Sequence, residues 1–323
     1  MTGRGTTTFE PPRAEQVRTY LQRHPATAPS RMLAWMPIIA LGGAVMISWA
    51  ATSGWVQTLP WAIIAGLLVF LTHRVRWVRH MEQQVTRVQE LAMTRRYTVA
   101  MRLAWRLLPK VAAMPAMHGR VVAFMAHILD QLRAYEAAVF AYEYLIHQLP
   151  VEHPGSVQLQ IHRAIAQLAN DQLADADETL RRVRGHVEAL QHPTTGASFR
   201  LAHLIQQVRT NHFAEAIESS SHLVADLRPL GIEAGYGHAL VALAYHNHAL
   251  NHGAANDAMA APWWSQATLL LPVEALVERF AELSTIAGQY PMSPIRPLGP
   301  RDTSASGTDR GGASQNSPML PPP

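Results

Sequence analysis

The stretch from Met32 to Thr72 contains no Asp, Glu, Lys, Arg or His, and it constrains the chain more than any other feature. It is too long for a single membrane-spanning helix. A helix rises about 1.5 Å per residue and the hydrocarbon core is about 30 Å thick, so one crossing takes about 20 apolar residues. The stretch divides into apolar runs over 32–51 and 59–71. We therefore expect a transmembrane hairpin of two helices over residues 32–77.

Arginine residues flank both predicted spans, whereas the segment between the spans carries no charge. The flanking residues are Arg13, Arg18, Arg23 and Arg31 before the first span, and Arg74, Arg76 and Arg79 after the second. Positively charged flanks stay in the cytoplasm. Arg is used almost to the exclusion of Lys, which occurs only at Lys110, and Ala is frequent, as in GC-rich bacterial genomes. The sequence predicts a multi-pass protein of the bacterial cytoplasmic membrane with both termini cytoplasmic.

Composition excludes several classes of function. The chain has no Cys, which excludes disulfides, thiolate metal sites and cysteine nucleophiles. The sequence pI is about 9.7, but the formal charge is only +4 and much of the Arg excess lies beside the predicted spans. A nucleic-acid partner is therefore not expected.

Three further segments have distinct compositions. Residues 1–31 form a predicted cytoplasmic arm with a short helix near 14–24, which lies either on the membrane surface or in solvent. Residues 78–118 read as linker or capping helices, and either continue the second span as one long helix or cap the first repeat. Residues 291–323 are rich in Pro, Ser and Gly and are expected to be a disordered tail.

Residues 119–290 show apolar side chains at helical spacing and no strand-like alternation, which predicts an all-α domain. The segment also repeats itself. One set of apolar or small residues matches a later set at a constant offset: Ile161, Ile165, Leu168, Leu173 and Ala176 correspond in order to Leu201, Ile205, Val208, Phe213 and Ala216. Val121, Met125 and Ile128 precede Ile161, Ile165 and Leu168 by the same offset, and Tyr135 and Ala138 precede Leu173 and Ala176 by a slightly shorter one. The pattern predicts helical hairpins that bury their apolar stripes by stacking on one another.

Two stretches resemble the second helix of a tetratricopeptide repeat. They are Tyr135-Glu136-Ala137-Ala138-Val139, followed by Pro150, and Phe213-Ala214-Glu215-Ala216-Ile217, followed by Pro229. The resemblance covers about residues 119–229. The period is longer than the family's, which is about 34 residues, and the family's first-helix Trp and Gly are missing. The resemblance implies an α-solenoid whose concave surface binds peptides, with a solenoid of generic helical hairpins as the alternative.

Four polar residues occupy matched positions on predicted first helices. Arg163 pairs with His203, and Gln167 pairs with Gln207, each at the offset that relates Ile161 to Leu201. Matched polar positions in a stacked solenoid tend to line one surface. We take these four residues as candidates for a partner-binding groove, with plain exposure to solvent as the alternative.

Signatures of catalysis are missing from the sequence. The chain has no phosphate-binding Gly loop outside the predicted span and tail, and no nucleophile elbow surrounds Ser219 to Ser221. The seventeen His residues are densest over 238–252, where His248 and His252 share a helical face, but no carboxylate completes a zinc motif. No catalytic residue, cofactor or metal site is predicted, and metal binding by 238–252 is left open.

These features favour a membrane-anchored scaffold that holds a protein or peptide partner, itself membrane-associated, through a cytoplasmic helical-repeat domain. An anchor raises the effective concentration of such a partner. One alternative is an accessory subunit of a larger membrane enzyme or transporter. A His-dependent metalloenzyme is the least favoured alternative.

Overall fold

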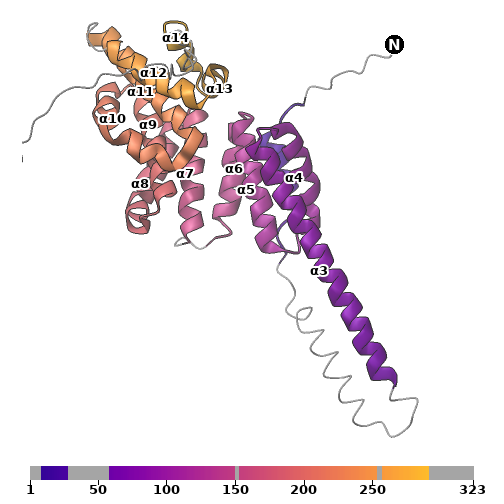
Figure 1. The fold of residues 1–323 in the computed structure, drawn as a ribbon. Coiled ribbons are helices and arrows are strands. Elements are labelled where there is room, and N and C mark those ends of the chain that lie inside the picture. Colours follow the sequence, from indigo (N-terminus) through magenta and orange to yellow (C-terminus); the bar gives the residue numbers. More distant parts are fainter. Residues whose placement is uncertain (1–8, 28–57, 150–152, 253–256, 291–323) are drawn as a thin grey trace, which may run out of the picture. The chain divides into compact units, whose positions relative to one another are not determined.

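The computed structural model describes residues 9–27, 58–149, 153–252 and 257–290. These residues form helices and no strand, which confirms the all-α prediction for them (Figure 1). The helices are α1 (Ala14–Arg23), α3 (Thr58–Met93), α4 (Tyr97–Val111), α5 (Pro115–Gln131), α6 (Tyr135–Ile146), α7 (Pro154–Ala169), α8 (Leu173–Leu190), α9 (Pro193–Arg209), α10 (Phe213–Leu227), α11 (Ala234–His252), α12 (Asp257–Leu270), α13 (Val273–Arg279) and α14 (Ser284–Ala287), with 3-10 turns η1 (Arg228–Glu233) and η3 (Ala281–Leu283). The predicted first span over 32–51 and the tail over 291–323 lie outside the described residues.

The same type of turn joins the two helices in each of four successive hairpins, namely α3–α4, α5–α6, α7–α8 and α9–α10. In each turn a non-glycine residue takes the left-handed conformation: Arg95 (φ 58), Arg133 (φ 62), Asp171 (φ 58) and Asn211 (φ 60). The N–H of the next residue donates to the carbonyl five positions earlier, as in Arg96 to Leu91 at 2.8 Å, Ala134 to Leu129 at 2.9 Å, Gln172 to Gln167 at 2.9 Å and His212 to Gln207 at 2.8 Å. This bond closes the end of each first helix and reverses the chain.

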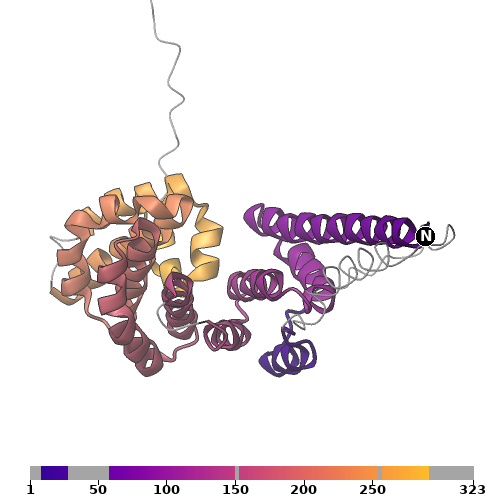
Figure 2. The ribbon, with the colours of Figure 1, turned by 90° about the horizontal axis from the view of Figure 1, so that it is seen from below.

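The burial pattern follows these turns. The left-handed residues recur along the chain at a nearly constant interval. Five positions after each of them stands an alanine with 0 % exposure, namely Ala100, Ala138, Ala176 and Ala216. A methyl side chain at a buried helix crossing lets the two helices of a hairpin approach closely. The recurrence is compatible with a helical-repeat fold, in which neighbouring helices pack side by side in chain order (Figure 2).

The packed part of the first of the four hairpins, residues 81–111, lies within residues 78–118, which were expected to be linker or capping helices. Helix α3 runs without a break to Met93, as one of the two sequence alternatives held. Its last turns pack on α4 and α5, with Val85 and Val88 fully buried. Residues 81–111 therefore belong to the packed body.

Helix α1 packs on α6 and beside α4. Val17 and Leu21 are fully buried. The Tyr20 hydroxyl donates to the Trp105 carbonyl oxygen at 2.6 Å, and the two rings stack with centroids 4.0 Å apart. The Arg18 guanidinium lies 4.9 Å from the centroid of the Phe140 ring. These contacts join the N-terminal helix to segments much later in the chain.

The predicted multi-pass membrane location is wrong. Within the described ranges, no helix combines the length and the apolar character that a membrane crossing requires. In α3 the apolar run of 59–72 ends at His73 and Arg74, which leaves fewer than the roughly 20 apolar residues of a span. The charge-free stretch does extend further in the sequence, but its first part lies outside the described residues. Several large apolar side chains in this part of α3, including Trp61 and Val69, are exposed.

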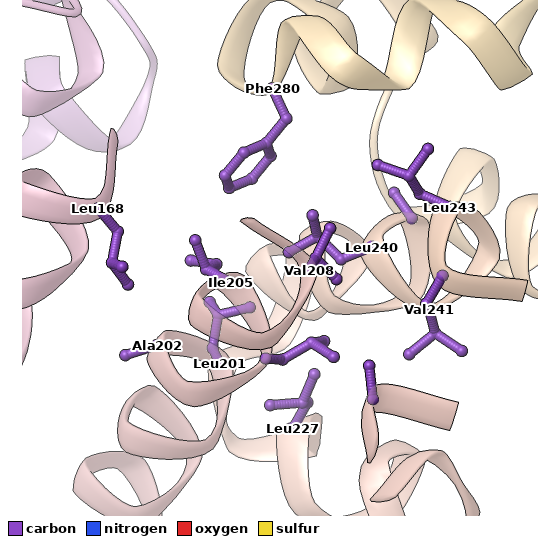
Figure 3. Close-up of a cluster of buried hydrophobic side chains, with 14 of the residues drawn as sticks. Leu168, Leu201, Ala202, Ile205, Val208, Leu227, Leu240, Val241, Leu243 and Phe280 are labelled. Atoms are coloured by element: carbon purple, nitrogen blue, oxygen red, sulfur yellow. The ribbon is translucent and has the colours of Figure 1, made fainter. Parts of the chain in front are cut away.

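Two clusters of buried apolar side chains fill the helical body. One cluster contains side chains of α1 and of the helices from α3 through α6, and the other contains side chains of the helices from α7 through α14. In the second cluster, Leu168 of α7, Ile205 of α9 and Leu240 of α11 gather with Phe280, which follows α13 (Figure 3). Helices α6 and α7 pack on each other and connect the two clusters.

The C-terminal helices return to earlier hairpins through two arginines. Arg279 of α13 donates to both carboxylate oxygens of Asp130 at 2.9 and 2.7 Å and to its carbonyl oxygen at 2.8 Å. Both side chains are buried, with exposed fractions of 8 % and 9 %. Arg209 at the end of α9 pairs with Glu282 of η3 at 2.9 Å. Asp130 stands three positions before its left-handed turn residue, where the other hairpins carry the apolar Ala92, Leu168 and Val208.

Candidate functional site

Three cavities share lining residues, and we call the three together the central groove. Their volumes are about 580, 40 and 360 Å³. Gln131 and Tyr236 line all three cavities, and His127, His162, Leu230 and Glu233 line both the first and the second. Arg95 and Tyr97 line both the first and the third. The third cavity therefore extends the first toward the hairpin turns.

The groove is lined mainly by the first helices of successive hairpins. The residue six positions before each left-handed turn residue faces it in all four hairpins: Gln89, His127, Ile165 and Ile205. Among the described second helices, α4 contributes Tyr97 and α6 contributes Tyr142. The remaining walls come from η1, α11 and α13. At this position Gln89 and His127 line the cavity of about 580 Å³, whereas Ile165 and Ile205 are buried and line only the cavity of about 40 Å³.

The lining combines apolar walls with polar and charged groups, among them Arg95 and Glu233. Met93, Phe124, Leu159 and Ile232 supply apolar surface in the cavity of about 580 Å³, together with the hydrogen-bonding amide of Gln131. The Tyr97 hydroxyl donates to the Gln131 side-chain oxygen at 3.4 Å. Pockets with apolar walls and a few placed polar groups are typical of ligand sites.

His162 is held neutral inside this groove. The amide nitrogen of Gln158 lies 2.9 Å from Nε2 of His162 and donates to the Ser198 hydroxyl at 3.2 Å. An amide nitrogen only donates, so Nε2 accepts and the imidazole proton is on Nδ1. Burial, followed by repulsion from His127, lowers the pKa of His162 to about 4. The Tyr142 ring stacks on the imidazole, with centroids 6.0 Å apart.

This environment predicts that stability declines in mild acid. His162 is neutral in the folded chain but binds a proton below pH 6.5 in the unfolded chain, so acid favours unfolding. The free energy of unfolding is expected to fall by up to about 1.4 kcal/mol for each unit from pH 6.5 down to about 4. When the free energy of unfolding is measured by urea titration at several pH values in this range, its plot against pH should have a shallower slope for His162→Gln than for the wild type. Equal slopes would contradict the assignment.

The four groove candidates from the sequence lie elsewhere on the first helices. Arg163 donates to the Thr179 hydroxyl of α8 at 2.8 Å, and that hydroxyl donates to Gln167 at 3.4 Å. His203 and Gln207 are hydrogen-bonded to each other on α9, and burial lowers the pKa of His203. None of these four residues lines the central groove. Their contact with a partner stays a prediction.

The reason lies in the register of the helix. The four candidates stand four and eight positions before the turn residues Asp171 and Asn211. Two residues of an α-helix correspond to about 200° of rotation, so these positions differ in direction from the groove position, six before the turn. In α5 the corresponding positions are Met125 and Leu129, which are fully buried. Matched spacing alone identified equivalent positions without showing which face is open.

The His-rich segment 238–252 does not converge on one point. His238 and His246 are buried, whereas His252 is exposed. The His248 and His252 rings approach with centroids 4.5 Å apart. The described part of the chain contains no group of three or more His, Asp and Glu side chains placed to hold a metal ion.

Sequence reasoning missed the residues that form the groove. The position six before each turn carries two polar and two apolar residues, so it has no uniform character. Leu230, Ile232 and Glu233 come from η1, a connection between hairpins whose path the pattern of helices does not specify. The sequence did contain one signal of the groove: Asp130 is a charged residue at a position where the other hairpins carry an apolar one.

Comparisons of the chain with protein-family models, with curated proteins and with solved structures found no match.

Proposed function

We propose that this protein is a binding scaffold similar to tetratricopeptide-repeat proteins, which holds a peptide segment of a partner protein in the central groove. One observation carries the proposal: the first helices of four successive hairpins contribute the same position to the lining of the central groove. In stacked repeats such a surface is where extended partners bind. The proposed role is binding and not catalysis.

The chemistry of the lining supports a peptide as the ligand. An apolar side chain of the partner fits between Phe124, Leu159 and Ile232 in the cavity of about 580 Å³. The amides of Gln131 and Gln158 supply donors and acceptors for a peptide backbone, whose N–H and C=O groups need partners when they leave water. Neutral His162 adds apolar surface without placing a charge in the groove.

A charge placed in the groove is expected to abolish this binding. Ile232 is 55 % exposed, so Ile232→Glu should leave the fold intact while it puts a carboxylate among apolar walls. Peptides selected from a random dodecamer display library on the wild-type protein should bind Ile232→Glu at least about tenfold more weakly, as measured by fluorescence anisotropy.

Val224→Glu is the matched control. Val224 is 49 % exposed on α10 and lines none of the three cavities of the groove. Its affinity for the selected peptides should stay within about twofold of the wild type, as for surface substitutions away from a site. The proposal fails if no peptide is enriched, or if both substitutions change the affinity equally.

A further inference from the structure

Two of the four turn residues are unusual for the conformation they adopt. Left-handed backbone is tolerated best by Gly, Asn and Asp, and Asp171 and Asn211 follow that preference. Arg95 and Arg133 hold the same conformation in the first two hairpins with φ of 58° and 62°. Unfavourable backbone conformations that persist tend to cluster at ligand clamps.

Both arginines lie at the same end of the central groove. Arg95 and Arg133 line the cavity of about 360 Å³ together with Tyr97, Gln131 and Tyr236. Their side chains are exposed, and no ion pair joins either of them to a carboxylate among the described residues. Burial raises the pKa of Tyr97 and of Tyr236, and the field of Arg95 opposes that rise at both phenols while the field of Glu233 adds to it.

The other charges of this cavity leave the two arginines in excess. Arg279 also lines it, but Asp130 neutralises that guanidinium through a bidentate pair. Glu278 is the one carboxylate among the lining residues of this cavity, and Glu233 lies in the adjoining two. The lining of this cavity itself therefore has the two exposed guanidinium groups and one exposed carboxylate, while Glu233 shares the cavity of about 580 Å³ with Arg95.

We propose that Arg95 and Arg133 form an anion clamp that binds an oxyanion carried by the partner peptide, next to the apolar residue that enters the groove. The inference rests on the proposed function. A planar guanidinium donates two parallel hydrogen bonds to a carboxylate or a phosphate, so both groups share the required chemistry. The clamp thus sets the direction of the peptide, with its anionic residue at the hairpin turns and its apolar residue between Phe124 and Ile232.

The test uses the full chain and three synthetic versions of one library-selected dodecamer. These carry Glu, phosphoserine or Gln at the position where acidic residues are enriched. For the wild type, the Glu or the phosphoserine peptide should bind at least about tenfold more tightly than the Gln peptide. The stronger of the two identifies the source of the oxyanion. In Arg95→Gln/Arg133→Gln this preference should disappear while the Gln peptide binds as before.

Arg184→Gln/Arg228→Gln is the matched control, because it removes the same charge from exposed residues that line no cavity of the groove. It should keep the full preference. A second variant, Arg95→Asn/Arg133→Asn, should raise the urea midpoint, because Asn suits left-handed backbone, and should still lose the preference. The inference is overturned if the double Gln variant keeps the preference, or if the selected peptides bind the groove without any acidic enrichment. Failure of the wild type to bind any peptide would instead overturn the proposed function.

Discussion

Arg279→Leu is expected to lower the free energy of unfolding by about 3–5 kcal/mol, because it leaves the Asp130 carboxylate buried without a counter-charge. Asp130 accepts two hydrogen bonds from the Arg279 guanidinium, which also lies 5.4 Å from the Tyr135 ring centroid. The wild-type side chains have exposed fractions of only 8 % and 9 %, so the carboxylate left behind is poorly hydrated. Urea unfolding followed by circular dichroism measures the change.

Two variants show whether the loss comes from the pair. Asp130→Leu/Arg279→Met removes both charges and places an apolar residue where the neighbouring hairpins have Ala92 and Leu168, so most of the lost stability should return. Arg228→Leu removes an exposed Arg and should change the free energy of unfolding by less than about 0.5 kcal/mol. A loss no larger than this for Arg279→Leu would contradict the buried pair.

Leu107→Ala is expected to destabilise the protein by about 2–5 kcal/mol, the usual cost of removing a buried Leu side chain. Leu107 of α4 is 3 % exposed and occupies the position of Leu145, Val183 and Leu223 in the following hairpins. The cost arises only if α3–α4 is packed as a full hairpin. In a linker helix the same change would cost little. Urea unfolding gives the size of the loss, and hydrogen exchange should show weaker protection first in α4 and α5.

Leu269→Ala provides the comparison, because Leu269 of α12 is 71 % exposed and the chemical change is identical. It should alter the free energy of unfolding by less than about 0.5 kcal/mol. If both variants were equally stable, residues 81–111 would have to be regarded as a peripheral segment.

The helical hairpins were predictable from the sequence, because the residues that repeat are the ones that are buried. Ala138, Ala176 and Ala216 recur with the apolar residues around them, and their burial in each hairpin requires small side chains. The hairpin over 81–111 escaped notice because its first helix continues from an apolar run. The same Ala position, Ala100, was present as a signal.

The candidate site was not predictable in the same way. The packing of the next hairpin and of η1 decides which face of a first helix lines the groove. Neither packing produces a periodic pattern in the sequence. Arg163 and Gln167 were chosen because they match His203 and Gln207, yet the hydroxyl of Thr179 binds both of the former between α7 and α8. The membrane location was inferred from apolar length in the sequence, whereas within the described residues the apolar run of α3 ends at His73 and Arg74.

The contact between Arg279 and Asp130 joins residues 149 positions apart. A contact of this kind changes the order in which the parts of a helical-repeat protein unfold. A row of units held only by nearest neighbours frays from its ends, because the terminal unit has a partner on one side alone. Here the last helices are tied back to the second hairpin, so they should resist proteases as long as that hairpin does. Removing the Arg279–Asp130 contact is therefore expected to change unfolding from one cooperative transition into stepwise unfolding that begins at α13.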